Sequence, residues 1–189
     1  MTTTIIGIPG SLRSGSYNAA LLRAAAALAP DSASLEIATI KGIPLYDGDS
    51  ETADGVPEIV TTLKDRIAAA DGLLLATPEY NNSMPGVLKN AIDWLTRPPT
   101  DIARVFRNRP VAVIGATPGG FGTVLAQSAW LPVFRTLGMR AWFGARLQVA
   151  RANKVFNEAG ELVDDTARSQ LQKFVHGFVS FVKDGPRPE

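Results

Sequence analysis

The rest of this sequence is arranged around one loop near its start: Gly10-Ser11-Leu12-Arg13-Ser14-Gly15-Ser16-Tyr17-Asn18. It follows a β-prone apolar run and precedes an alanine-rich stretch that favours helix. Its glycines permit close backbone approach, and its serine, asparagine and arginine side chains supply hydrogen-bond donors. A loop of this composition at the N-terminus of a helix is typical of an anion site, and we expect the anion to be a phosphate.

The same loop excludes two kinds of nucleotide site. Gly10 and Gly15 have the Gly-x4-Gly spacing of a P-loop, but Ser16 and Tyr17 stand where lysine and serine or threonine are required. The glycines also lack the G-x-G-x-x-G spacing of a dinucleotide fingerprint. What remains is a site for a single phosphate, held by Arg13 and by hydroxyl, amide and backbone donors. The alternative is a strand-to-helix turn in which Ser16 caps the helix.

Strand-like and helix-like segments alternate five times along the 189 residues. Strands are predicted over residues 3–9, 35–40, 73–77, 111–115 and 139–143, and helices over 16–28, 57–70, 87–96, 123–137 and 164–182. Residues 41–57 and 151–163 are predicted to be irregular, and Pro132 predicts a break near residues 128–131. The fifth strand has a possible continuation around residues 147–149. This alternation predicts one α/β domain over residues 1–189, a doubly wound five-stranded parallel sheet between two helical layers.

Three loops marked by glycine or proline follow the first, third and fourth strands, at residues 10–18, 78–86 and 116–122. In the strand order 2-1-3-4-5 these strands are neighbours, so their loops meet at the edge where such sheets bind ligands. In the second loop, Tyr80 is a candidate wall for a flat heterocycle and Asn81 a candidate for its polar edge. A solvent-exposed turn is the alternative. The glycines of the third loop leave backbone N–H groups free to approach the opposite edge of the ring.

Composition narrows the chemistry. There is no cysteine and His176 is the only histidine, so thiolate nucleophiles, disulfides and multi-histidine metal sites are excluded. His176 is expected at the surface without a catalytic role. We therefore expect a bound group to carry the chemistry, and we predict no metal site.

Charge and hydropathy point away from nucleic acid and membrane as partners. Net charge is +1, and no basic tract is long enough to follow a nucleic-acid backbone. The most basic segment carries Arg97, Arg104, Arg107 and Arg109, and we favour a solvated surface over an anion site for it. There is no signal-like N-terminus and no apolar stretch of about 20 residues, so we expect a cytoplasmic protein.

A second motif reads Pro78-Glu79-Tyr80-Asn81-x-Ser83-x-Pro85-Gly86-Val87-Leu88-Lys89-Asn90-Ala91-Ile92-Asp93-Trp94. Together with residues 10–18 it resembles the NADPH-dependent FMN reductase family, in particular its chromate and quinone reductase members. The resemblance implies a flavodoxin-like fold, FMN as cofactor, NADPH or NADH as co-substrate, and chemistry at flavin N5 without a catalytic protein side chain. It also implies a homodimer or homotetramer, which agrees with the wide apolar face predicted for the helix over residues 87–96, although core packing explains that face equally well.

The resemblance further implies the residues of the cofactor site. It assigns the FMN phosphate to Ser11, Arg13, Ser16, Tyr17 and Asn18, the isoalloxazine ring to Pro78, Glu79, Tyr80 and Asn81, and the pyrimidine edge to Thr117, Gly119 and Gly120.

The predicted function is that of an FMN-dependent NAD(P)H oxidoreductase. It passes electrons in two half-reactions to a small-molecule acceptor such as a quinone, an azo compound or chromate. One alternative is a flavodoxin-type electron carrier without NAD(P)H turnover, although a net charge of +1 is unlike the one-signed surface on which such carriers rely. The other is a non-redox site for a phosphorylated ligand on the same scaffold.

Overall fold

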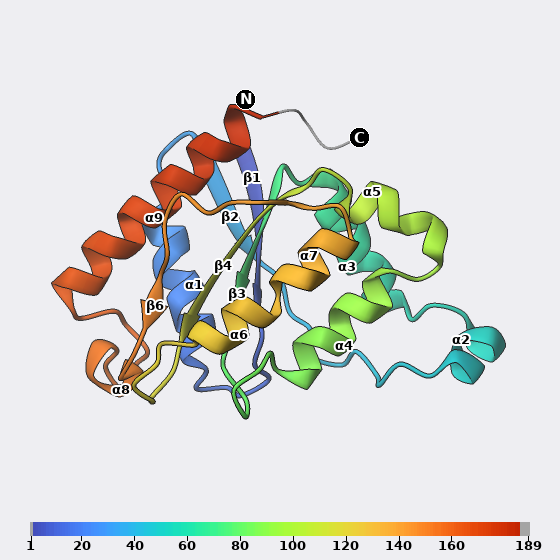
Figure 1. Ribbon diagram of the computed structural model, residues 1–189, viewed down its shortest axis with the longest axis horizontal. Helices are drawn as coiled ribbons and strands as arrows, with labels where there is room; N and C mark the ends of the chain where they lie inside the picture. The colour runs from blue at the N-terminus through green and yellow to red at the C-terminus, as the bar shows by residue number, and fades with distance from the viewer. Residues whose placement is uncertain (1, 186–189) are drawn as a thin grey trace.

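The first strand, β1 (Thr3–Pro9), lies inside a parallel sheet, and nearly all of its residues are buried on both faces. This burial is typical of a strand in a parallel sheet covered by helices on both sides. β1 pairs with β2 (Ala33–Ile37) on one side and with β3 (Gly72–Ala76) on the other. β3 pairs in turn with β4 (Pro110–Ala116). The structure is a computed structural model that describes residues 2–185, and its sheet runs through the middle of the molecule (Figure 1).

The edge beyond β4 is made of two short strands. β5 (Arg140–Ala141) pairs with the start of β4, and β6 (Gln148–Val149) pairs with its end. The path β2-β1-β3-β4-β5 is the predicted strand order, but the sheet has a sixth strand, β6, which lies off this path at the possible continuation predicted around residues 147–149. The reason is Trp142, whose indole packs edge-on against Phe174 with ring centroids 4.8 Å apart. The chain bends around this indole instead of continuing along β4.

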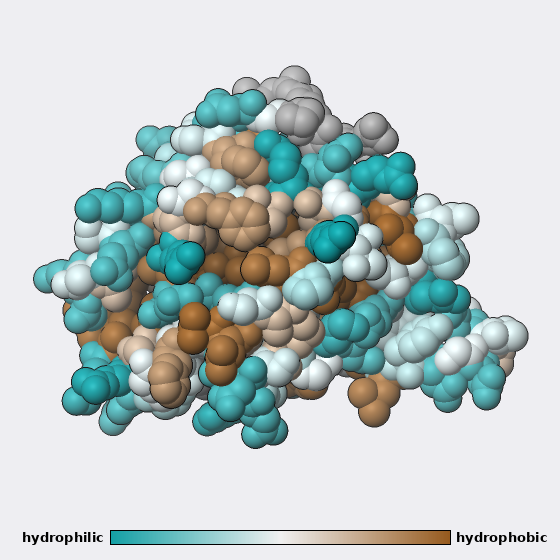
Figure 2. Space-filling view, in the orientation of Figure 1, coloured by the Kyte–Doolittle hydropathy of each residue, from teal (hydrophilic) through white to brown (hydrophobic). Residues whose placement is uncertain are grey.

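The bend leaves apolar side chains uncovered at this edge of the sheet. A cavity of about 190 Å³ between the bend and the neighbouring helices is lined by Val113, Leu131 and Phe143, among others. Phe143 is 71% exposed and Leu131 is 41% exposed. Figure 2 shows hydrophobic atoms reaching the surface across the middle of this face of the molecule.

Helices cover both faces of the sheet because successive strand residues point to opposite sides. Ile5 belongs to the core under α1 (Tyr17–Ala27) and α9 (Asp165–Lys183), and the adjacent Ile6 belongs to the core under the opposite layer. That opposite layer contains α3 (Glu58–Ala69), α4 (Gly86–Leu95), α5 (Ile102–Phe106) and α7 (Leu131–Thr136) (Figure 1). The predicted α/β/α layering is therefore confirmed.

Segments predicted to be irregular contain short helices. Residues 41–57 include α2 (Gly48–Asp54), and residues 151–163 include α8 (Ala152–Val155). A further turn of 3₁₀ helix, η1 (Pro99–Asp101), precedes α5. The break predicted from Pro132 is confirmed, because α6 (Val124–Ala129) and α7 are separated by one residue, Trp130.

Residues 44–51 form a strap across α4. The Tyr46 ring packs edge-on against Trp94 with centroids 5.0 Å apart, and the Trp94 indole N–H donates to the carbonyl of Pro44 at 2.9 Å. Further along, the carboxylate of Glu51 accepts two hydrogen bonds from Nε of Arg97, at 2.8 and 2.9 Å. The strap therefore covers the Trp94 side of α4 within this chain, and the predicted subunit contact at this helix stays a prediction.

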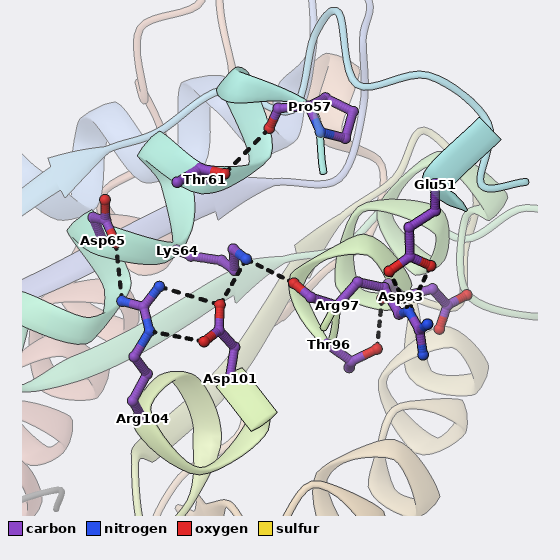
Figure 3. Close-up of polar contacts among 10 residues, drawn as sticks. All are labelled: Glu51, Pro57, Thr61, Lys64, Asp65, Asp93, Thr96, Arg97, Asp101 and Arg104. Atoms are coloured by element: carbon purple, nitrogen blue, oxygen red, sulfur yellow. Dashed lines mark hydrogen bonds and ion pairs between the residues drawn. The ribbon is translucent and has the colours of Figure 1, made fainter. Parts of the chain in front are cut away.

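Figure 3 shows how α3 is tied to the segment after α4. Lys64, whose side chain is 3% exposed, donates to Asp101 at 2.7 Å and to the carbonyl of Arg97 at 2.6 Å. Arg104 donates to the same Asp101 at 3.3 Å and to Asp65 at 2.9 Å.

The basic segment is thus not a uniformly solvated surface. Arg97 and Arg104 are paired with carboxylates, and only Arg107 is freely exposed. For Arg109 the prediction is wrong, since its side chain is 1% exposed. Its guanidinium donates to backbone carbonyls of Ala68, Ala70, Arg104 and Val105, at the ends of α3 and α5.

His176 is exposed, as predicted, with a ring nitrogen 3.2 Å from the carbonyl of Leu28. Within residues 2–185, no helix combines the length and the apolar character needed to cross a membrane.

Stability at acidic pH is expected to depend on Asp101. Hydrogen bonds from Arg104 and then Lys64 hold the pKa of this carboxyl below its ordinary value of 3.8. The stabilisation is therefore complete above the ordinary pKa and is lost as pH falls through the lower value of the folded state. We expect wild type to exceed Asp101→Asn in free energy of unfolding at neutral pH, with a gap that narrows toward about pH 3. Urea titrations of both proteins across this range measure the gap, and a gap independent of pH would contradict the assignment.

Candidate functional site

The three predicted loops meet at the carboxyl ends of β1, β3 and β4. They enclose a cavity of about 110 Å³. Its lining comes from all three loops and consists of Ser11, Arg13, Gly15, Ser16, Tyr17, Asn18, Pro78, Glu79, Tyr80, Ala116, Thr117 and Pro118. Nine of the twelve predicted site residues are in this lining, and Asn81, Gly119 and Gly120 are not. Gly15, Ala116 and Pro118 line the cavity but were not among the predicted site residues. The signal that finds them is their place, in the first loop for Gly15 and directly at the end of β4 for the other two.

The first loop joins β1 to the N-terminus of α1. The Ser16 hydroxyl accepts a hydrogen bond from the backbone N–H of Ala19 at 3.2 Å, so it caps the helix. Gly15 lies in the lining, and a Cβ at this position would meet nothing within 4 Å. The loop is therefore both a capped turn and one wall of a cavity, so the two interpretations of Ser16 are compatible.

Arg13 supplies the positive charge of the cavity. It is exposed, and no carboxylate within residues 2–185 forms an ion pair with it. It is also the one cationic side chain in the lining. A guanidinium beside a helix N-terminus favours an anion, because the charge and the helix dipole act in the same direction.

Asn18 connects the first loop to the third. Its side chain is buried, with the amide Nδ2 donating to the carbonyl of Ala116 and Oδ1 accepting from the N–H of Ala116, both at 2.9 Å. This pair satisfies the backbone of the residue at which β4 ends. Its predicted phosphate contact stays a prediction, while its contact with Ala116 is a role that sequence reasoning missed.

Replacing Asn18 with alanine is expected to lower the free energy of unfolding by about 1 to 2 kcal/mol, because it leaves both backbone groups of Ala116 buried without a partner. Urea unfolding without added flavin measures this change. The matched control is Asn153→Ala, which truncates an exposed asparagine of α8. Equal stability of the two variants would contradict a structural role for Asn18.

The second loop is a tight turn. Tyr80 and Ser83 exchange backbone hydrogen bonds of 3.0 and 3.1 Å, and the two residues between them, Asn81 and Asn82, have φ of 49° and 62°. Asparagine tolerates this left-handed conformation better than most residues. Asn81 therefore serves the turn, whereas Tyr80, which is 43% exposed, stands at the cavity. The Tyr80 hydroxyl lies 3.5 Å from Oγ of Ser11, at the outer limit of a hydrogen bond.

The third loop is held by β6 and by the residues that follow it. Thr117 N–H donates to Val149 at 3.0 Å, and Thr117 O accepts from Ala152 N–H at 3.0 Å. Gly119 O accepts from Arg151 N–H at 2.9 Å. Thr117 and Pro118 face the cavity, while Gly119 and Gly120 lie beyond its lining.

Comparison with known proteins adds the family. The sequence profile described as NADPH-dependent FMN reductase matches residues 3–154. The chain is 44% identical over 179 residues to an NAD(P)H-dependent FMN reductase of Pseudomonas aeruginosa, covering 95% of each protein. It is 38% identical over 184 residues to a 2-hydroxy-1,4-benzoquinone reductase of a Burkholderia species, covering 97% of this chain and 98% of the relative.

A solved structure gives the same result for the fold. The flavoenzyme NAD(P)H:(acceptor) oxidoreductase FerB from Paracoccus denitrificans superposes with a TM-score of 0.85 at 35% identity. The alignment covers 96% of this chain and 98% of that structure.

Proposed function

This chain belongs to the NADPH-dependent FMN reductase family and is an FMN-dependent NAD(P)H oxidoreductase, and from that premise we propose that it passes the electrons of NAD(P)H to quinones. Azo compounds and chromate are further acceptors within the proposal. A cytoplasmic location, where reduced nicotinamide cofactors are available, is part of it too. The observation that carries the proposal is the cavity lined by all three loops, with Arg13 as its one cation.

The residues present fit one end of FMN. A phosphate requires donors and positive charge, and Arg13, Ser11 and the N-terminus of α1 provide them around open space at Gly15. The enclosed volume, about 110 Å³, is below the roughly 300 Å³ at which pockets begin to enclose a whole ligand. The cavity therefore accommodates the phosphate end, and exposed side chains such as Tyr80 are left to contact the ring.

When bound, FMN supplies hydride-transfer chemistry at its N5 atom. The chain's own residues have the tasks of binding and orientation: Arg13 neutralises the phosphate, Tyr80 offers an aromatic surface, and Thr117 and Pro118 form the third side. The lining contains no histidine or cysteine, and its one carboxylate, Glu79, accepts two backbone hydrogen bonds through Oε2, so we assign no lining side chain a role in proton transfer.

The test combines a spectrum with a rate measurement. Purified protein mixed with FMN is expected to show the visible absorption of bound flavin and to oxidise NADH or NADPH steadily when a benzoquinone is added. Flavin binding without NAD(P)H turnover would indicate an electron carrier instead. Protein that does not bind FMN would indicate a different phosphorylated ligand.

A homodimer or homotetramer that uses the region of residues 87–96 is part of this proposal. The supporting feature is an apolar groove of about 390 Å³ between α4 and α7, lined in part by Ile92, Val133 and Leu137. Analytical ultracentrifugation tests it, and a monomer at micromolar concentration would contradict it.

A further inference from the structure

Glu79 lies at the start of the second loop, but its carboxylate is directed to a different element. Its Oε2 atom accepts hydrogen bonds from the backbone N–H groups of Leu125 at 2.9 Å and Ala126 at 3.0 Å. These N–H groups belong to the first turn of α6, where backbone donors have no partner inside the helix. Glu79 therefore caps the N-terminus of α6, although it lies 46 positions before Leu125 in the chain.

The start of α6 has no cap of its own. Thr123, the residue before the helix, makes no side-chain cap bond and has φ of 67°. Its hydroxyl instead accepts from Nε2 of Gln127 at 3.1 Å, and the same amide group donates to the carbonyl of Leu147 at 2.9 Å. The carboxylate of Glu79 thus does what a local serine or aspartate does at other helices.

The position of α6 determines the end of the third loop. Gly115 is packed so closely that a Cβ there would collide with the Thr123 side chain and with the carbonyl oxygen of Thr77. Residues 116–122 therefore run between a fixed point at Gly115 and the start of α6. A carboxylate that belongs to the second loop and accepts from α6 therefore sets the distance between two walls of the cavity.

We infer that Glu79 is a positioning residue for the cofactor site: it fixes the second loop to α6, and α6 in turn fixes the third loop. In this role Glu79 acts through the helix and not on the reacting atoms, in contrast to the ring contact that the family resemblance implies. The inference rests on the proposed function, because FMN is the ligand whose binding it affects.

The experiment compares Glu79→Gln with Glu79→Ala in the full chain. Glutamine keeps an oxygen that can accept the same two hydrogen bonds but removes the charge, whereas alanine removes the acceptor. Glu158→Ala, which deletes an exposed carboxylate in a turn, controls for loss of charge alone. The readouts are amide hydrogen exchange of residues 125 and 126 by NMR, measured without flavin, and the dissociation constant for FMN.

Glu79→Ala is expected to speed hydrogen exchange at both amides. It is also expected to weaken FMN binding by about tenfold, which corresponds to the charge-assisted contact between Glu79 and α6 that it removes. Glu79→Gln is expected to keep both amides protected and to retain FMN affinity within about threefold. Normal exchange in Glu79→Ala would overturn the inference, as would fast exchange with unchanged affinity. Equal losses of affinity in both variants, with protected amides in Glu79→Gln, would show that the carboxylate acts on the cofactor directly. If wild type itself did not bind FMN, the proposed function would fail while the exchange data still reported on the contact with α6.

Discussion

Replacing Arg109 with methionine is expected to lower the free energy of unfolding by about 3 kcal/mol. The guanidinium is buried and satisfies carbonyl oxygens of Ala68, Ala70, Arg104 and Val105. Methionine fills much of the same volume but donates no hydrogen bond. Each carbonyl left buried without a partner costs about 1 to 3 kcal/mol.

Two effects oppose each other in this substitution. Burial lowers the pKa of Arg109 to about 10. The charged form therefore has a desolvation cost in the core, although the guanidinium stays charged at neutral pH. Removing the charge recovers part of this desolvation cost. We expect the loss of hydrogen bonds to outweigh the recovered desolvation cost, because the carbonyls at the C-terminal ends of α3 and α5 carry the negative end of each helix dipole.

Urea denaturation of wild type and Arg109→Met measures the difference. Arg107→Met is the matched control, since Arg107 is exposed two positions earlier and its replacement is expected to change stability by less than about 0.5 kcal/mol. A stability of Arg109→Met equal to that of the control would show that desolvation balances the hydrogen bonds.

The second large effect is on cofactor affinity. Replacing Arg13 with alanine is expected to weaken FMN binding by about 1.5 to 3 kcal/mol, which corresponds to roughly ten- to 150-fold. The reason is that Arg13 is the one cation in the cavity lining, so nothing else there replaces its charge. Because Arg13 is exposed, the stability of the protein without flavin is expected to change little.

Titration of flavin-free protein with FMN, followed by quenching of flavin fluorescence, measures the loss. Arg23→Ala removes an exposed arginine of α1 outside the cavity and serves as control. Riboflavin, which lacks the phosphate, is expected to bind wild type and Arg13→Ala equally. Unchanged FMN affinity in Arg13→Ala would remove Arg13 from the phosphate site.

Most strands and long helices could be predicted because their signals are local. β1, β3 and β4 are continuous apolar runs between turn residues, and Pro132 by itself indicates the break between α6 and α7. The helix α2 was missed because it buries none of its residues. It is stabilised by its cap at Asp47 and by the distant pairing of Glu51 with Arg97.

The split of the sheet edge was predicted only in part, as a possible continuation of the fifth strand around residues 147–149, for a related reason. Residues 139–149 are apolar enough to form a strand, but the indole of Trp142 finds a better environment against Phe174 and Phe178 of α9. No pattern within the segment indicates a partner more than 30 residues away, and the same holds for the carbonyls of Ala68 and Ala70 that accept from Arg109.

The three loops that line the candidate site, and the positive charge in the first of them, could be predicted from the sequence. Composition, spacing and strand order are sufficient for that, since parallel strands place their loops at one edge. Only the tertiary structure decided how two of the polar side chains are used. Asn18 is bound to Ala116, 98 positions later, and Glu79 to the start of α6. A side chain of this kind can bind a ligand or a backbone group equally well by its chemistry, and the choice depends on which unsatisfied donors and acceptors the folded chain brings next to it.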